Sequence, residues 1–328
     1  MHSAEFEPPP WLVNPHLQSI LPSVGPRRAG VFRRAAPLLA ASRMRLVDCG
    51  DGVRLAGQHA QQPCGSGELI LLLHGWEGSA ESLYVLSAGQ YLWEQGYDVF
   101  RLNLRDHGAT HHLNPELFHS CRIAEVVGAV RAVQTACPGQ PLSLVGYSLG
   151  GNFVLRVAAR APAAGIRLRR VIAVCPVLDP AHTLASLEHG PWIYRHYFVL
   201  KWRRSLVLKL RAWPGRYDLD ELLRHRNLTA MTAHLVQRYT DFPDLGAYLR
   251  GYAITGEALA ALAVPAHILS ALDDPIIPAH DLARLAPSRA LSVVTTRRGG
   301  HCGFLDRFSG ESWSDRRVYA LLKDGSAC

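Results

Sequence analysis

The 328-residue sequence predicts an α/β fold with a mostly parallel, doubly wound sheet. Short apolar runs of strand length alternate with stretches of helical period from Leu69 to Cys175. The same alternation resumes at Ala266 and continues to Leu322. Strands and helices that alternate in this way form parallel sheets with helices on both faces.

The break between these two blocks is the second informative feature. No strand pattern appears from Asp179 to about Leu262, a stretch that holds three of the seven Trp and six of the eleven Tyr. Because the sheet pattern continues afterwards, an insertion explains the break better than two independent domains. We therefore expect a core over residues 43–178 and 263–328, with a helical lid over residues 179–262.

The individual elements are predicted in chain order. Residues 1–42 are rich in Pro and Arg and predict an extended segment that wraps the core. The predicted strands are a hairpin of Arg43–Asp48 and Val53–Gln58 around Gly50-Asp51-Gly52, then Leu69–Leu73, Tyr97–Leu102, Leu142–Val145, Val171–Cys175, Ala266–Ala271 and Leu291–Thr296. The predicted helices are Ser79–Gln95, which ends before Gly96, then Ile123–Thr135, Leu149–Arg160 and Ser314–Leu322.

Composition narrows the class of protein. With 48% hydrophobic and 19% charged residues, the chain is not intrinsically disordered. The first residues lack the basic and apolar regions of a secretory signal, and no run reaches the roughly 18 apolar residues of a membrane span. A net charge of +8 with no accompanying recognition motif does not support nucleic-acid binding. The seven cysteines form no C-x-x-C pair, which predicts reduced thiols in a soluble cytoplasmic protein; they are residues 49, 64, 121, 137, 175, 302 and 328.

The most informative motif is G-x-S-x-G, formed by Gly146-Tyr147-Ser148-Leu149-Gly150. It lies directly between a predicted strand and a predicted helix, where a sharp turn raises a serine hydroxyl above the sheet. The glycines leave room for that turn, and the helix N-terminus stabilises a developing oxyanion. A tight turn with a passive serine is the alternative. The strand before it and the helix after it favour Ser148 as a nucleophile.

A nucleophilic serine needs a base, which is usually an oriented histidine. Among the sixteen histidines, His301 follows the last predicted strand, at the carboxyl edge of the sheet where α/β active sites lie. A loop histidine stabilised by glycine turns is the alternative. His111, His112 and His119 could suggest a metal, but no ligand set such as H-E-x-x-H accompanies them. We therefore expect His301 to be the base and no metal to take part.

An acid that orients this histidine is expected at the same edge of the sheet. Asp273 and Asp274 follow the predicted strand Ala266–Ala271. Adjacent carboxylates normally point in different directions, so only one of them should reach the base. Asp274 is favoured over Asp273, and Asp179, which follows another strand, is a third candidate.

Two backbone donors are expected to stabilise the oxyanion. One is the N–H of Leu149, directly after the nucleophile. The other is the N–H of Trp76 in the loop after the predicted strand Leu69–Leu73, where Gly75 allows close approach of the chain. The alternative is that His74-Gly75 simply ends the strand.

Together these elements resemble the α/β-hydrolase superfamily over residues 43–325. The order Ser148, Asp274, His301 is that of these hydrolases and differs from the orders in chymotrypsin and subtilisin. Four segments also resemble the YheT-like hydrolases, a bacterial family similar to plant embryogenesis-associated and animal ABHD-type esterases and lipases. These segments are Phe6–Ile20 (FEPPPWLVNPHLQSI), His74–Ser79 (HGWEGS), Gly146–Asn152 (GYSLGGN) and Asp273–Pro278 (DDPIIP).

The resemblance implies serine esterase chemistry on carboxylic esters without a cofactor. It places the triad on Ser148, Asp274 and His301. One departure is Arg105-Asp106-His107-Gly108, because relatives tend to carry small residues after the arginine. The rim of the pocket, and with it the substrate, is therefore expected to differ.

The predicted lid contains a basic stretch, residues 195–216, with seven Lys or Arg and no acidic residue. Six of its apolar residues fall on one helical face; they are Phe198, Val199, Trp202, Leu206, Leu210 and Trp213. Four cations lie off that face, namely Lys201, Arg203, Arg204 and Arg211, and Pro214 ends the helix. This pattern predicts a lid helix packed on the core, with contact to an anionic membrane surface as the alternative. An aromatic roof over Ser148 favours an apolar acyl chain over a sugar or a nucleotide.

The sequence therefore predicts a serine carboxylesterase or lipase-like hydrolase that works through an acyl-enzyme on Ser148. A thioesterase or an acyltransferase would use the same residues. A non-catalytic protein that binds lipids or other ligands is an alternative of another class. The complete triad argues against it.

Overall fold

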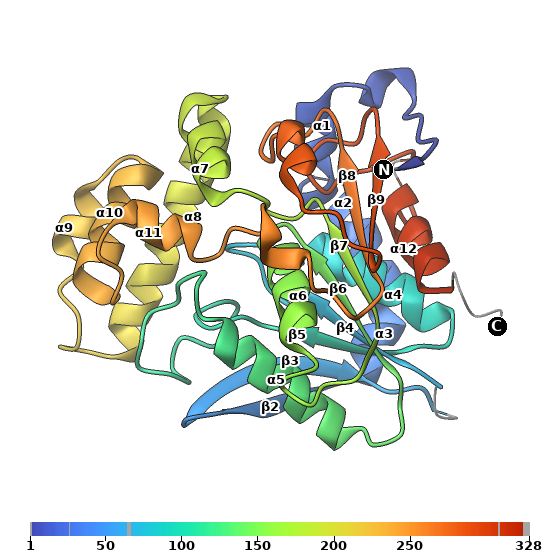
Figure 1. The fold of residues 1–328 in the computed structure, drawn as a ribbon, viewed down its shortest axis with the longest axis horizontal. Coiled ribbons are helices and arrows are strands. Elements are labelled where there is room, and N and C mark those ends of the chain that lie inside the picture. The colour runs from blue at the N-terminus through green and yellow to red at the C-terminus, as the bar shows by residue number, and fades with distance from the viewer. Residues whose placement is uncertain (1, 26, 64–66, 308, 324–328) are drawn as a thin grey trace.

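A computed structural model describes residues 2–25, 27–63, 67–307 and 309–323. Within these residues, nine strands form one sheet in the order β1-β9-β8-β7-β6-β4-β5-β3-β2 (Figure 1). The strands are β1 (His2–Ser3), β2 (Ser42–Gly50), β3 (Val53–Ala60), β4 (Leu69–Leu73), β5 (Asp98–Leu102), β6 (Leu142–Tyr147), β7 (Leu168–Val174), β8 (Ala266–Ala271) and β9 (Leu291–Thr296). β3 runs antiparallel to β2 and β5, and the other neighbouring pairs are parallel. The predicted hairpin and the predicted mostly parallel sheet are confirmed.

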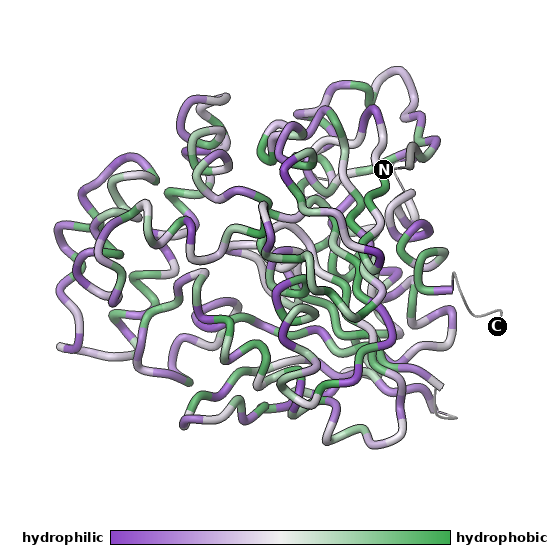
Figure 2. Tube along the Cα trace, viewed as in Figure 1, coloured by the Kyte–Doolittle hydropathy of each residue, from purple (hydrophilic) through white to green (hydrophobic). Residues whose placement is uncertain are grey.

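Helices cover both faces of this sheet and create two separate apolar cores. Alternate residues of the fully buried strand β4 point to opposite faces, so Leu71 packs in one core and Leu72 in the other. α5 (Ile123–Ala136) and α6 (Leu149–Arg160) cover the first face, and α4 (Leu83–Glu94) and α12 (Trp313–Lys323) cover the second. Figure 2 shows hydrophobic residues concentrated in the central strands.

The N-terminal segment differs from its prediction. It forms three short helices, α1 (Pro15–Ile20), α2 (Arg27–Arg34) and α3 (Ala36–Ala41), so the prediction of a purely extended segment is wrong. Val31, Ala35 and Leu38 are buried at helical spacing. The helical spacing of these three residues was not recognised in the sequence because many Pro and Arg residues surround them.

The helix predicted to begin at Ser79 begins at Leu83 instead. Residues 79–82 form a turn, in which the N–H of Ser79 donates to Ser82 Oγ over 2.9 Å. The N–H of Ala80 donates to the side chain of Asn103, which follows the neighbouring strand β5. These side-chain acceptors compete with helical hydrogen bonds and delay the start of the helix.

The segment between β7 and β8 folds as a helical cap beside the sheet (Figure 1). Its helices are α7 (Pro180–His189), α8 (Trp192–Ala212), α9 (Asp220–Arg224), α10 (Leu228–Tyr239) and α11 (Leu245–Arg250). The predicted apolar face of α8 is confirmed, because Val199, Trp202 and Leu206 are buried. None of the described helices is both long and apolar enough to cross a bilayer.

One lysine on the buried face of α8 ties the cap to the core. Lys209 Nζ lies 2.7 Å from Asp106 Oδ1 and also donates to the carbonyl oxygens of Asn114 and Glu116. The side chains of Lys209 and Asp106 are 1% and 7% exposed. Three oxygen acceptors therefore replace water around this ammonium group. Asp106, which stands where relatives tend to carry a small residue, thus anchors the cap to the core.

Replacing Lys209 with methionine should lower the free energy of unfolding by about 3–5 kcal/mol, because Asp106 would remain buried without its partner. Urea or thermal unfolding measures this loss. An Arg211→Met variant, which removes an exposed cation from the same helix, should change stability by less than about 0.5 kcal/mol. The double variant Asp106→Asn/Lys209→Met should be more stable than the single Lys209 variant. A double variant that is equally unstable would contradict the ion pair as the cause.

Candidate active site

Ser148 occupies a sharp turn between β6 and α6. Its backbone angles are φ 53° and ψ −120°, a conformation that residues other than glycine rarely adopt. The N–H of Ser148 donates to the carbonyl oxygen of Val174 on β7 over 2.9 Å, which fixes the turn against the sheet. Leu149 is the first residue of α6, so its N–H has no acceptor within the helix.

Two glycines make this turn possible. A Cβ atom at Gly146 would lie 2.2 Å from the carbonyl oxygen of Gly150. A Cβ atom at Gly150 would lie 2.4 Å from the carbonyl oxygen of His74, in the loop after β4. Both obstacles are backbone atoms, so neither position accepts a side chain without displacement of the turn. The strand–turn–helix context predicted for the G-x-S-x-G motif is confirmed.

His301 and Asp274 are in direct contact. His301 Nδ1 lies 2.8 Å from Asp274 Oδ2. The other carboxylate oxygen of Asp274 accepts the backbone N–H groups of Ile276 and Ile277, at 2.8 and 3.0 Å. A carboxylate at Nδ1 selects the tautomer in which Nδ1 carries the proton, so Nε2 is the basic nitrogen of the neutral ring.

Ser148 and His301 line the same cavity. In the described part of the chain, no hydrogen bond joins Ser148 Oγ to the His301 ring. Hydrogen bonds between a nucleophile and its base are often long in ligand-free sites and shorten when substrate binds. The structure therefore brings His301 and Asp274 into contact, and Ser148 lines the same cavity as His301.

The two other candidate acids have different contacts. Asp273 Oδ1 accepts the N–H of Gly300 over 2.9 Å, so it holds the loop that carries His301. Asp179 caps α7 and forms an ion pair with Arg284 over 2.6 Å. Of these three candidates, Asp274 is the one that reaches the imidazole.

The electrostatic surroundings of His301 favour its charged form. Burial alone would lower the pKa of His301, but the charge of Asp274 and the neighbouring Cys302 outweigh it. The pKa of His301 is therefore raised well above its ordinary value of 6.5. Asp274 thus stabilises the imidazolium that forms when His301 accepts a proton.

The N-terminal segment holds the His301 loop in place, a role that the sequence pattern did not reveal. Gln18 is fully buried, and its amide exchanges two hydrogen bonds with the backbone of Leu305, at 2.8 and 2.9 Å. Ser19 Oγ accepts the backbone N–H of His301 over 2.8 Å. The composition of this segment does not predict these contacts. The resemblance of Phe6–Ile20 to a known family was the one feature of the sequence that pointed to a role for the segment.

The loop after β4 approaches Ser148 closely. A Cβ atom at Gly75 would lie 3.1 Å from the Cβ of Ser148. The N–H of Gly75 donates to Tyr84 Oη over 2.9 Å, which restrains the loop. Trp76 follows, and its ring stacks on Phe198 of the cap with centroids 5.2 Å apart.

His74 organises this loop as a neutral side chain. The N–H of Leu104 donates to His74 Nε2 over 3.2 Å, so Nδ1 carries the proton and donates to the carbonyl oxygen of Gly75 over 2.7 Å. Burial lowers the pKa of His74 to about 4. His74 therefore stays uncharged at neutral pH and fixes the peptide that precedes Trp76.

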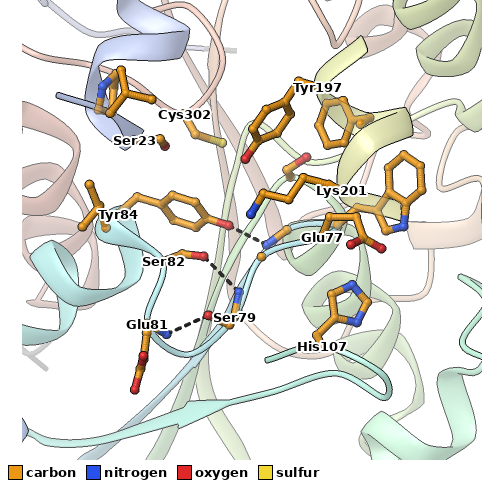
Figure 3. A pocket seen from close by; sticks show the side chains of 18 of the residues that line it. Ser23, Glu77, Ser79, Glu81, Ser82, Tyr84, His107, Tyr197, Lys201 and Cys302 are labelled. Carbon is orange, nitrogen blue, oxygen red and sulfur yellow. Dashed lines mark hydrogen bonds between the residues drawn. The ribbon is translucent and has the colours of Figure 1, made fainter. Parts of the chain in front are cut away.

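Two cavities adjoin Ser148. The larger, of about 650 Å³, lies between the cap, the N-terminal segment and the loop after β4 (Figure 3). The smaller, of about 100 Å³, lies under the cap between α6, α7 and α10. Sequence reasoning predicted an aromatic roof over Ser148 but could not resolve these two spaces, because they arise from the placement of the cap.

A family model described as the alpha/beta hydrolase fold matches residues 68–308, which is well over half of the chain. The chain belongs to this family. The fold and the resemblance predicted from the sequence are thereby confirmed. The matched residues include the G-x-S-x-G turn, Asp274 and His301.

Individual proteins that are similar to this chain in sequence or in structure support its assignment to the α/β hydrolases. The putative esterase YheT of Escherichia coli (strain K12) is 26% identical over 332 residues, which cover 96% of this chain and 92% of that protein. Human protein ABHD15 is 25% identical and is aligned over 94% of this chain and 66% of its own length. Among solved structures, the esterase Pf2001 of Pyrococcus furiosus superimposes with a TM-score of 0.59 at 14% identity, over 88% of this chain and 94% of that chain. The protein is thus a YheT- and ABHD-like α/β hydrolase.

The other histidines that the sequence singled out have structural contacts in this hydrolase. His111 Nε2 lies 2.9 Å from Ser205 Oγ on α8, and the His119 ring packs against the rings of Phe242 and Tyr248. Burial lowers the pKa of His111 to about 4 and that of His119 to about 3. In the described chain, three groups of His, Cys or acidic side chains lie close enough to share an ion, and none includes His111, His112 or His119.

The cysteines of the described chain are free thiols. They are Cys49, Cys121, Cys137, Cys175 and Cys302. Cys64 and Cys328 lie outside the described residues. Cys302 lines the larger cavity directly after His301 (Figure 3).

Proposed function

We propose that this hydrolase is a serine esterase that cleaves carboxylic esters through an acyl-enzyme on Ser148. The observation that carries the proposal is the 2.8 Å contact between Asp274 and His301 beside the cavity that Ser148 lines. An oriented, basic imidazole next to a serine on a strained turn is the arrangement that activates a hydroxyl for acyl transfer.

The reaction proceeds in two halves. Ser148 Oγ attacks the ester carbonyl while His301 Nε2 takes its proton, and the N–H groups of Leu149 and Trp76 stabilise the oxyanion. His301 then protonates the leaving alcohol. Water, deprotonated by the same imidazole, attacks the acyl-enzyme and releases the acid.

The chemistry of the smaller cavity supports an apolar acyl group. Its lining is mostly aromatic and aliphatic, and includes Trp76, Leu187, Phe198, Trp202 and Leu235. An apolar acyl chain is transferred from water into such a space at no cost in lost hydrogen bonds.

Covalent labelling tests this function directly. A fluorophosphonate probe should label the wild-type protein, with the modified peptide containing Ser148, because only an activated serine reacts with it. A Ser23→Ala variant, which removes another hydroxyl from the larger cavity, should be labelled equally. A correctly folded protein that takes up no label would contradict the proposal.

The raised pKa of His301 predicts the pH dependence of the reaction. Protonated His301 cannot accept the proton of Ser148, so kcat/KM should fall on the acid side. Because the pKa is raised well above 6.5, kcat/KM should reach half of its maximum at a pH above 6.5. Removal of the Asp274 charge should lower the pKa of His301, so the rise of kcat/KM with pH should begin at a lower pH. A half-maximum below pH 6.5 in the wild type would contradict this electrostatic account.

A further inference from the structure

The two cavities that meet at Ser148 differ in their lining as well as their size. Both are lined by Trp76, Ser148, Phe198 and Ile276. A substrate bonded to Ser148 can therefore extend in two directions, one into each cavity.

The positions of His301 and Leu149 assign a direction to each half of the ester. In the described chain, His301 lines the larger cavity and not the smaller. His301 must reach the leaving oxygen to protonate it, so the alcohol lies in the larger cavity. Leu149, which supplies an oxyanion donor, lines the smaller cavity and not the larger. The acyl chain is therefore directed into the smaller cavity.

The volume of the smaller cavity limits the acyl chain. It measures about 100 Å³. A cavity of roughly 150 Å³ holds a benzene molecule, so this one accommodates about four carbon atoms or fewer. A long fatty acyl chain does not fit without displacement of the cap.

In the described part of the chain, the larger cavity is lined by cations that form no salt bridge. Lys201 and Arg204 of α8 both line it. Figure 3 shows the Lys201 side chain pointing from the cap into the cavity, toward Tyr84. Its amino group lies 5.6 Å from the centre of the Tyr197 ring. Within the described residues, Lys209 is the lysine of α8 with a salt bridge, and neither Lys201 nor Arg204 forms one.

The acidic residues of this cavity do not neutralise these cations. Asp106 is already paired with Lys209, and Glu81 is exposed on the outer side of the loop. Burial raises the pKa of Glu77 to about 8, although Lys201 opposes the shift. Arg28 lines the cavity as well, so its three cations outnumber Glu77 and Glu81, and the lining carries a net positive charge even when both carboxylates are ionised.

We propose that the substrate is an ester of a short apolar acid with a bulky alcohol that carries an anionic group. The proposal rests on the serine esterase function above. Hydrolysis breaks the acyl C–O bond, and water supplies the hydroxyl of the released acid and the hydrogen of the released alcohol. Lys201 and Arg204 bind the anionic group of the alcohol while His301 protonates its ester oxygen.

A matched pair of fluorogenic esters tests the alcohol side. 7-Butyryloxycoumarin-3-carboxylate carries the anion, and its 3-carboxamide is a neutral compound of nearly equal shape. Wild-type kcat/KM should be about tenfold higher for the carboxylate, since hydrogen bonds to charged groups are the stronger ones. The ratio should fall at high salt, because part of the cavity is open to solvent. Lys201→Gln should bring the ratio close to one, and Arg204→Gln should lower it less.

Further variants and substrates test the anionic alcohol, the short acyl chain and the esterase function separately. Arg211→Gln, a cation of α8 outside the cavity, should retain the wild-type ratio. A wild-type ratio of one or below, or a ratio that Lys201→Gln leaves intact, would overturn the anionic alcohol. Octanoyl esters turned over faster than butyryl esters would overturn the short acyl chain. If neither coumarin ester is hydrolysed and the fluorophosphonate does not label Ser148, the esterase function itself fails.

Discussion

Replacing Ser148 with alanine should reduce kcat for p-nitrophenyl butyrate by about 10⁴- to 10⁶-fold, because no acyl-enzyme can form. The remaining rate would come from the oxyanion donors and from binding alone. The backbone at this position is already in a rare conformation, with φ 53°. Alanine and serine experience that strain equally, so the fold should be retained. Steady-state hydrolysis by the purified variant measures the effect.

The control for this variant is its stability. Its thermal midpoint should stay within a few degrees of the wild type, about the change expected from less than 1 kcal/mol in a protein of this size. A folded variant that keeps most of its activity would exclude Ser148 as the nucleophile.

Replacing Asp274 with asparagine should lower kcat by about 10³- to 10⁴-fold. An asparagine can offer its amide N–H to His301 Nδ1, which selects the wrong ring tautomer and removes the charge that stabilises the imidazolium. Measuring kcat across the neutral and alkaline range distinguishes this loss from a simple shift of the pH profile.

Asp273→Asn is the matched control, since it changes the adjacent residue in the same way. Asp273 holds the N–H of Gly300 and does not contact the imidazole. Its asparagine variant retains an acceptor oxygen, so kcat should fall by no more than roughly tenfold, the cost of one weakened hydrogen bond. Equal losses in the two variants would contradict the assignment of Asp274 as the orienting acid.

The sheet could be predicted because its strands have strong local signals. β4 is a continuous apolar run buried on both faces, and β8 and β9 coincide with their predicted ranges Ala266–Ala271 and Leu291–Thr296. The contact between Asp274 and His301 was also predictable, because the loops after these two strands emerge at one edge of a parallel sheet. For β8 and β9, the local sequence pattern is therefore enough to predict both the strands and the edge of the sheet at which Asp274 and His301 meet.

Features that depend on contacts distant in sequence could not be predicted. Lys209 lies on the buried face of α8, and its burial depends on Asp106 and two backbone carbonyl oxygens that are about 100 residues away in sequence. The helices of the N-terminal segment have only six to eight residues, too few to be stable alone, so they depend on packing against the core. The division of the site into two cavities depends on how the cap rests on Trp76, which no periodicity encodes.

The contact between Gln18 and Leu305 joins residues 287 positions apart. During translation, Gln18 emerges from the ribosome on the order of tens of seconds before Leu305, at typical elongation rates. During that interval the turn that carries Ser148 has already been synthesised, but the loop that carries His301 has not. Gln18 and Ser19 therefore still lack the residues that they contact in the folded protein. The arrangement around His301 should therefore be completed late in a nascent chain, when the segment that contains Gln18 and Ser19 contacts the loop that contains His301 and Leu305.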